Sequence, residues 1–313
     1  MFKLGAQPKT LDIQGICPHT ERPLAIRAEV SDGRLAILDA REFSGISATA
    51  LRGWSSCKKT IMLLPPEMHG VSMMLTPAGS LSPDQIHEAL RWAFSKDSTI
   101  SMDNAEWETM KVPDQEGGGS LLKEHYWIFA VEKPTLRRLL DPLIKAKIRI
   151  EAVDALASAQ RNLCWAEAKG RAGEGVEPRP AAYASLVIGK SYSALGIMSA
   201  DGDMLFHKQL EWTEASLGRI DSKQKLYSDL QRNIEYFERR LSAVGVGQGY
   251  VYGSQSGALC DYLKSASGSM DWSPGIYPGV DWSTQPDSNA LRLRPEGISG
   301  DWAWILGSLW RMG

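Results

Sequence analysis

The sequence lacks any long apolar segment. Its longest apolar stretches, such as residues 126–131, have about the length of a buried strand, whereas a membrane-spanning helix needs roughly 18 apolar residues. Residues 1–20 also lack the apolar run and the small-residue cleavage site of a secretory signal. We therefore expect a cytoplasmic protein that does not cross a membrane by itself.

The sequence is poor in cysteine and histidine, and neither residue type is clustered. The four cysteines are far apart and form no Cys-x-x-Cys pair, and the five histidines are isolated from one another and from paired carboxylates. This spacing indicates neither a disulfide framework nor a structural zinc site. We expect free thiols and no metal-binding residues.

An excess of charge of one sign is also absent, since 35 Lys and Arg stand against 37 Asp and Glu. A near-neutral chain is not typical of a dedicated nucleic-acid-binding protein. Hydrophobic residues make up 43% and charged residues 23% of the 313 residues, which is ordinary globular composition and excludes the disordered and fibrous classes. Tryptophan is abundant, with eleven residues. We expect these side chains in the core, and any exposed ones would mark a partner surface.

The second half of the chain, residues 182–313, predicts an alternation of strands and helices. Asp201-Gly202-Asp203 is typical of a hairpin turn, because glycine tolerates a positive φ. After this turn the apolar residues recur every three or four positions, which indicates a long helix. The predicted elements are strands at 185–188, 192–198 and 204–210, helix 222–241, strand 250–253, helix 257–266, a loop and strand over 275–282, and helix 302–310.

The first half, residues 1–168, begins with a similar meander of three strands and then carries an insertion at about 58–115. Ser82 as N-cap and Pro83 at the first helical position predict where a helix begins in this insertion. Pro142 predicts a kink or an early end in a later helix. The predicted elements are strands at 11–17, 24–30 and 34–43; in the insertion, strands 60–64 and 71–76, helix 83–96 and strand 105–111; then strand 126–131, a helix from 134, strand 148–153 and helix 154–168.

Two glycine-rich stretches predict breaks between these elements. Residues 169–181 lack apolar periodicity and predict a linker between the halves, and residues 113–120 predict a mobile loop. Both halves begin with a meander and then alternate helix and strand. This order predicts a duplicated α/β architecture, the actin-like or ribonuclease H-like two-domain fold, with a small inserted α+β subdomain in the first half.

Short motifs for catalysis are incomplete. Gly189-Lys190-Ser191 matches the end of a phosphate-binding P-loop, but Ala184 stands where the first glycine of that loop belongs. Ser55 and Ser222 each begin a Ser-x-x-Lys pattern, without the companion segments of the enzymes that use it. A hydrolase that uses Ser55 or Ser222 is therefore a weak hypothesis.

Several segments, taken in chain order, resemble a known family. Leu90-Arg91-Trp92 in the first strong helix precedes an acidic strand that ends at Lys111-Val112-Pro113. Residues 153–163 (VDALASAQRNL) and 230–238 (LQRNIEYFE) complete the set. Together they resemble the cytoplasmic actin-like proteins of type IV pilus assembly, the PilM and GspL-like family, and most closely its MshI type from pili of the mannose-sensitive haemagglutinin kind. The resemblance covers most of the chain.

The resemblance implies a scaffold protein rather than an enzyme. It implies that the chain sits on the inner face of the inner membrane, where it joins bitopic PilN/PilO-like proteins and communicates with a hexameric assembly ATPase. On this basis we expect a location peripheral to the inner membrane through protein partners, with no direct membrane span and no nucleic-acid partner.

The resemblance also raises the question of nucleotide binding. Actin-type sites use Asp-x-Gly hairpins, because the carboxylate orients Mg²⁺ and the glycine lets backbone amides approach phosphate. Here Val187 replaces the Asp of one hairpin, and Gln14 replaces the Gly that should follow Asp12 in the other. The remnants of a vestigial nucleotide cleft are Gly189, Lys190, Ser191, Gly253 and Ser254. We expect no catalytic residues and no hydrolysis even if ATP docks, and the competing hypothesis is an active ATPase or sugar kinase that uses the cleft between the halves.

Overall fold

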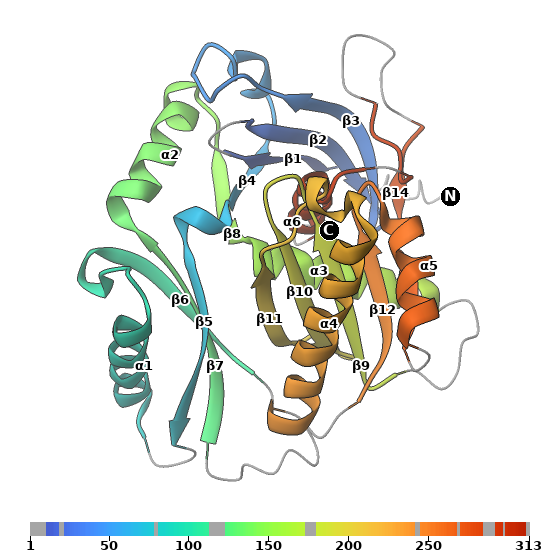
Figure 1. Ribbon diagram of the computed structural model, residues 1–313. Coiled ribbons are helices and arrows are strands. Elements are labelled where there is room, and N and C mark those ends of the chain that lie inside the picture. Colours follow the sequence, from blue (N-terminus) through green and yellow to red (C-terminus); the bar gives the residue numbers. More distant parts are fainter. Residues whose placement is uncertain are drawn as a thin grey trace, which may run out of the picture.

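A computed structural model of the chain (Figure 1) describes residues 11–18, 22–77, 81–112, 123–172, 180–241, 245–267, 270–283, 292–296 and 298–310. The glycine-rich loop expected at 113–120 lies outside these residues. All four cysteines are free and buried, as expected. Among the described helices, none has the length and apolar character needed to cross a membrane.

Two larger sheets repeat one strand order, which confirms the duplicated architecture. The first sheet has the order β14-β3-β2-β1-β4-β8 and the second the order β11-β10-β9-β12-β13. In each, an antiparallel meander of three strands is extended by parallel strands beside its first strand. The strands are β1 Leu11–Cys17, β2 Leu24–Ser31, β3 Arg34–Glu42, β4 Lys59–Leu64, β8 Ile150–Ala155, β9 Ala182–Ile188, β10 Ser193–Ser199, β11 Met204–Leu210, β12 Val246–Tyr252, β13 Asp271–Pro274 and β14 Val280–Asp281.

A third, smaller sheet forms the inserted subdomain. It has the order β5-β7-β6, from β5 Gly70–Pro77, β6 Ala105–Lys111 and β7 Lys123–Glu132, and helix α1 Pro83–Asp97 packs on it (Figure 1). Ser82 and Gln85 cap α1 reciprocally, as the sequence predicts for a helix that begins here. The expected bounds of the insertion differ from those found. β4 pairs with β1 in the first sheet, whereas β7 belongs to the small sheet, because β7 pairs with both β5 and β6.

The remaining helices cover the sheets and agree with the predicted order. Pro142 lies inside α2, which ends soon afterwards at Lys145. α3 continues to Ala172, so the first residues of the expected linker are helical, while 173–179 lie outside the described part of the chain. The helices are α2 Lys133–Lys145, α3 Leu156–Ala172, α4 Ile220–Tyr236 with a π-helical turn over Phe237–Leu241, α5 Ser256–Ser267 and α6 Gly300–Leu309, with 3₁₀ turns at Arg52–Trp54, Pro66–Met68, Met102–Asn104 and Ala215–Gly218.

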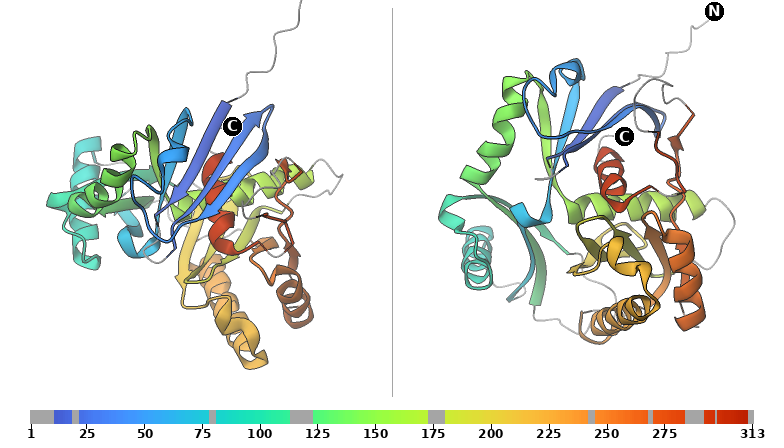
Figure 2. Two further views of the ribbon diagram at one scale, coloured as in Figure 1. Left: turned by 90° about the horizontal axis from the view of Figure 1, so that it is seen from above. Right: turned by 45° about the horizontal axis from the view of Figure 1, so that its top comes forward.

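The two halves of the chain exchange elements where they meet. α3, which ends the first half, packs on β9 and β10 of the second sheet, and α6, which ends the second half, packs on β1, β2 and β4 of the first (Figure 2). β14, also from the second half, pairs with β3. The expected division of the chain at 169–181 therefore separates the halves in sequence but not in space, because each sheet is covered by a helix from the other half.

Glycine residues allow α6 to approach α3 and the end of β9 closely. A Cβ atom at Gly307 of α6 would lie 2.1 Å from the carbonyl oxygen of Ala159 in α3. At the start of α6, a Cβ atom at Gly300 would lie 2.3 Å from the carbonyl oxygen of Ile188. Backbone atoms cannot yield as flexible side chains do, so only glycine fits at these two positions.

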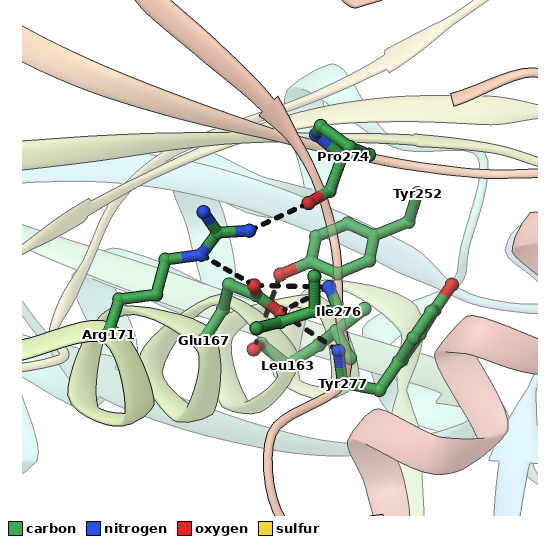
Figure 3. A network of polar contacts seen from close by, with 7 residues as sticks. All are labelled: Leu163, Glu167, Arg171, Tyr252, Pro274, Ile276 and Tyr277. Atoms are coloured by element: carbon green, nitrogen blue, oxygen red, sulfur yellow. Dashed lines mark hydrogen bonds and ion pairs between the residues drawn. The ribbon is translucent and has the colours of Figure 1, made fainter. Parts of the chain in front are cut away.

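A buried carboxylate fixes the segment that leads from the second sheet to the first (Figure 3). Glu167 of α3 is fully buried and accepts hydrogen bonds from the backbone N–H groups of Ile276 and Tyr277, at 3.1 Å each, and from Arg171 Nε at 2.9 Å. Arg171 also donates to the carbonyl oxygen of Pro274 at 2.8 Å. Burial raises the pKa of the Glu167 carboxyl, against the opposing effect of Arg171 and the two amides. The network therefore anchors 274–277 on α3, just before β14.

The tryptophans near the end of the chain are core residues. Trp272, Trp302 and Trp304 are all buried. The exposed tryptophans among the described residues are Trp92 on α1 and Trp165 on α3, and each ring lies under a lysine side chain of its own helix. Packing, and not a partner surface, therefore accounts for the C-terminal tryptophans.

We expect Gly307→Ala to destabilise the protein by about 3 kcal/mol, since overpacking against a rigid neighbour costs about 1–3 kcal/mol and here the neighbour is backbone. The free energy of unfolding in urea measures this. Gly257→Ala in α5 is the matched control, because a Cβ atom there meets nothing within 4 Å; its cost should be no more than a few tenths of a kcal/mol. Equal losses in the two variants would contradict the close crossing.

We expect Glu167→Gln to cost about 3–5 kcal/mol, because the amide of Gln presents N–H groups to backbone donors and leaves Arg171 without its carboxylate. Thermal unfolding followed by circular dichroism reports the loss. Glu235→Gln, which removes an exposed pair with Arg239, should change the stability by about 0.5 kcal/mol at most. An unchanged unfolding temperature in Glu167→Gln would show that the carboxylate is dispensable.

Candidate functional site

A cavity of about 300 Å³ lies between the two halves, where the sequence predicts a vestigial nucleotide cleft. Its lining comes from Cys17, Arg22 and Glu42 on the first sheet, from Lys190 and Ser191 in the turn between β9 and β10, and from Asp301 at the start of α6. Lys190 and Ser191 thus line a cavity between the two halves, and a role of theirs in nucleotide binding stays a prediction.

The carboxylate of Asp301 is hydrogen-bonded to the turn between β9 and β10. Asp301 Oδ2 accepts a hydrogen bond from the backbone N–H of Lys190 at 3.1 Å. A Cβ atom at Gly189 would lie 2.3 Å from Asp301 Oδ1, which explains the glycine without a phosphate. Since Asp301 also accepts from Ser299 Oγ at 3.1 Å, it is held in place by its own loop. A phosphate would have to displace this carboxylate.

Ion pairs further join the walls of the cleft. Lys190 Nζ lies 3.8 Å from Glu42 Oε2, and Arg22 donates to Glu42 Oε1 at 3.1 Å. Half of the Lys190 side chain is exposed, and exposed pairs of this kind contribute little to stability. Their consequence is electrostatic, because Glu42 pairs with both cations, Arg22 and Lys190, that an anion would need.

Gly253 and Ser254 lie on the other side of Ile188 and do not open into the same cavity. Gly253 has φ +143°, and its Cβ atom would lie 2.7 Å from the Ile188 carbonyl oxygen. The N–H of Ser254 donates to Glu214 Oε1 at 3.3 Å. The cavity beside these residues is only about 10 Å³, which is too small for a nucleoside. The carboxylate of Glu214 thus accepts the hydrogen bond that the amide of Ser254 could otherwise donate to a phosphate.

The remnant proposed in the first half lies elsewhere. Asp12 and Gln14 pair with Glu29 and Arg27 in the body of the hairpin of β1 and β2, whereas Cys17 and Leu24 flank its turn. Asp12 bonds to Arg27 at 3.3 Å. At about 3.3 Å per residue, Asp12 is roughly 17 Å from the turn. Sequence reasoning singled out Asp12 as the carboxylate of a degenerate Asp-x-Gly hairpin, but strand pairing places it away from the residues that line the cavity.

The remaining motif residues form no catalytic arrangement. Val187 is fully buried in β9. The hydroxyl of Ser55 donates to the carbonyl oxygen of Arg52 at 3.1 Å, and Ser222 lies in the first turn of α4. In the described part of the chain, no three His, Cys, Asp or Glu side chains are grouped as metal ligands would be.

A groove of about 340 Å³ lies between the small sheet and the first sheet. Five consecutive residues of β6 line it, as an edge does when it faces a cavity, whereas a face would contribute alternate residues. β8, the last strand of the first sheet, lies at the other side. The main lining residues are Glu106, Trp107, Glu108, Thr109 and Met110 of β6, Phe129, Ala130 and Val131 of β7, Leu136 of α2, Val153, Asp154 and Ala155 of β8, and Ser158, Arg161 and Asn162 of α3.

Two of the segments that carry the family resemblance meet in this groove. The acidic strand is β6, and Asp154, Arg161 and Asn162 all belong to segment 153–163. Sequence reasoning treated both segments as structural signatures and missed this site. Their polar residues were the available signal, but about 45 positions separate the two segments in the sequence, so only the fold shows that they share one groove.

The open edge of β6 has backbone groups that face away from β7. The N–H of Val112 donates to the carbonyl oxygen of His125 at 2.8 Å. Along an antiparallel pair, such hydrogen-bonded positions alternate with positions whose N–H and C=O point outward. By this alternation the N–H groups of Trp107 and Thr109 point away from β7, toward the position that a further strand would take.

No protein-family model matches the sequence, and no curated protein does. Solved structures do match. The structure of the PilM-PilN type IV pilus biogenesis complex is 15% identical, covers 96% of this chain and 98% of that chain, and superposes with a TM-score of 0.69. The cytoplasmic domain of EpsL, an inner membrane component of the type II secretion system of Vibrio cholerae, is 9% identical over 97% of this chain and 95% of that one, with a TM-score of 0.54.

The chain has the actin-like fold. A protein of unknown function from Bacteroides thetaiotaomicron, described as having an actin-like ATPase fold, is also similar, with 11% identity over 84% of this chain and 90% of that chain and a TM-score of 0.47. In this chain the fold consists of two sheets with the same strand order and of the two helices α3 and α6, which pack against each other.

We expect Mg-ATP to leave the unfolding temperature of the protein unchanged, because Asp301 and Glu214 occupy the amides that would bind phosphate. A ligand at about 100 times its Kd adds about 2.7 kcal/mol of stability, which would raise the temperature by several degrees. The double variant Asp301→Asn, Glu214→Gln is the control, and we expect it to respond to pyrophosphate. A rise of several degrees for the unaltered protein, together with phosphate release, would favour the ATPase or kinase hypothesis.

Proposed function

We propose that this chain is a cytoplasmic scaffold of a type IV pilus machine, of the MshI type. It links an inner-membrane PilN/PilO-like complex to the assembly ATPase and does not hydrolyse ATP. It is held at the inner membrane by these partners. The match over nearly the whole chain to PilM in the PilM-PilN complex supports the role, and the occupied amides of the cleft support the absence of hydrolysis.

The observation that carries the proposal is the groove between β6 and β8. In our proposal it receives the cytoplasmic tail of the PilN-like partner as an extended strand. Main-chain hydrogen bonds to an open sheet edge give affinity in this binding mode, and side-chain pockets give specificity. The outward N–H and C=O groups of β6 and the apolar floor formed by Phe129 and Val131 supply both features.

The test is binding of the purified protein to a synthetic cytoplasmic tail of the PilN-like protein encoded in the same genome. We expect Thr109→Pro to weaken binding about tenfold or more, because proline removes an outward N–H but no hydrogen bond to β7. Thr109→Val keeps that N–H and should bind like the unaltered protein. Fluorescence anisotropy of the labelled tail gives both dissociation constants.

Two outcomes would contradict the proposal. The first is an unaltered protein that fails to bind the tail at tens of micromolar. The second is equal binding by Thr109→Pro and Thr109→Val, which would place the tail away from the edge of β6. Circular dichroism of both variants shows whether the fold is retained.

A further inference from the structure

We propose that the groove selects a basic residue in the tail of its partner, and that the carboxylate of Glu108 makes this selection. The inference rests on the proposed function, since it concerns the same groove. It adds the feature by which the groove distinguishes one apolar tail from another, which is a basic residue at one position of the tail.

Glu108 points to the side of the small sheet that faces away from α1. Side chains alternate along a strand, and the ring of Trp107 lies 4.1 Å from the ring of His87 on α1. Trp107 therefore faces α1, and its neighbours Glu106 and Glu108 face the opposite side. Glu108 is directly opposite Phe129 in the register of β6 and β7, so an exposed carboxylate stands beside the apolar floor.

The three carboxylates that line the groove differ in their surroundings. Glu106 lies 3.7 Å from Lys133. Asp154 is buried and accepts from the N–H of Ala155 at 3.0 Å. Glu108 is exposed, and no ion pair within the described chain includes it.

The groove supplies little positive charge to balance these carboxylates. Arg161 directs its Nε to the carbonyl oxygen of Gly202 at 2.5 Å. Burial lowers the pKa of His69 to about 4, so its imidazole is neutral at pH 7. The lining therefore holds three carboxylates against one guanidinium, and Lys133 outside the lining pairs with one of the three, Glu106. One cation from the partner would balance the one remaining negative charge.

A membrane-anchored partner supplies such a cation. Cytoplasmic segments close to a membrane span are enriched in Lys and Arg. In a strand added to β6, the residue opposite Glu108 would have its Cβ atom about 5 Å from that of Glu108, which suits a cross-strand pair of opposite charge. The groove thus fits an extended segment with apolar residues toward Phe129 and one Lys or Arg beside Glu108.

A charge exchange tests this inference. The probe is the same synthetic tail, together with variants in which each Lys or Arg is replaced by Glu, one at a time. At low salt we expect Glu108→Lys to weaken binding of the natural tail about tenfold and Glu108→Gln to weaken it by a smaller factor. One of the reversed tails should restore the affinity of Glu108→Lys. The differences should shrink at about 0.5 M salt, because screening acts on exposed charges.

The control is Glu211→Lys, which makes the same charge change on an exposed residue that does not line the groove. It should bind the natural tail like the unaltered protein. Equal binding by Glu108→Lys and Glu211→Lys, or the failure of every reversed tail to restore affinity, would overturn the inference while leaving the groove as the binding site. Failure of the unaltered protein to bind any tail would overturn the proposed function as well.

Discussion

The close contact of α3 and α6 is the constraint on which the rest of the structure depends. Each helix covers the sheet of the other half of the chain, so the two sheets cannot separate without exposing both helices. The contact requires a residue without a side chain at Gly307, against the backbone of Ala159. α3 also carries Glu167, which fixes the segment leading to β14, and Arg161 and Asn162, which line the groove. α3 thus takes part both in the contact that holds the two halves together and in the lining of the groove.

Carboxylates of the chain itself accept hydrogen bonds from backbone amides beside the cleft between the halves. In a nucleotide-dependent protein, phosphate joins the two hairpins by accepting their amide hydrogen bonds. Here Asp301 and Glu214 accept comparable hydrogen bonds from Lys190 and Ser254. Because each carboxylate belongs to the chain, the bonds form whenever the chain folds. Both bonds lie within the second half of the chain, so the contact of α3 with α6 is what holds the two halves together.

The groove lies where the small sheet meets the first sheet, and its composition is mixed for a physical reason. Its floor is apolar because β7 also packs against the core through Trp127. Its side is polar because β6 is an edge strand whose outer groups face solvent. An edge strand beside an apolar floor is hazardous when uncovered, since it can pair with other chains. Exposed carboxylates such as Glu108 limit such pairing to segments of opposite charge.

The sequence by itself determined most of the elements and their order, although it did not predict β13. The capping residues Ser82 and Pro83 and the turn at Asp201-Gly202-Asp203 act locally, so the helix and the hairpin were predicted with nearly the bounds found. Lys190 and Ser191 line the cavity between the halves, and their part in a nucleotide cleft stays a prediction. Only the tertiary structure decided that Asp12 lies away from the cleft and that β4 belongs to the first sheet and not to the insertion. It also decided that β6 and α3 line the same groove. These depend on strand pairing and helix packing between distant segments, which no local pattern encodes.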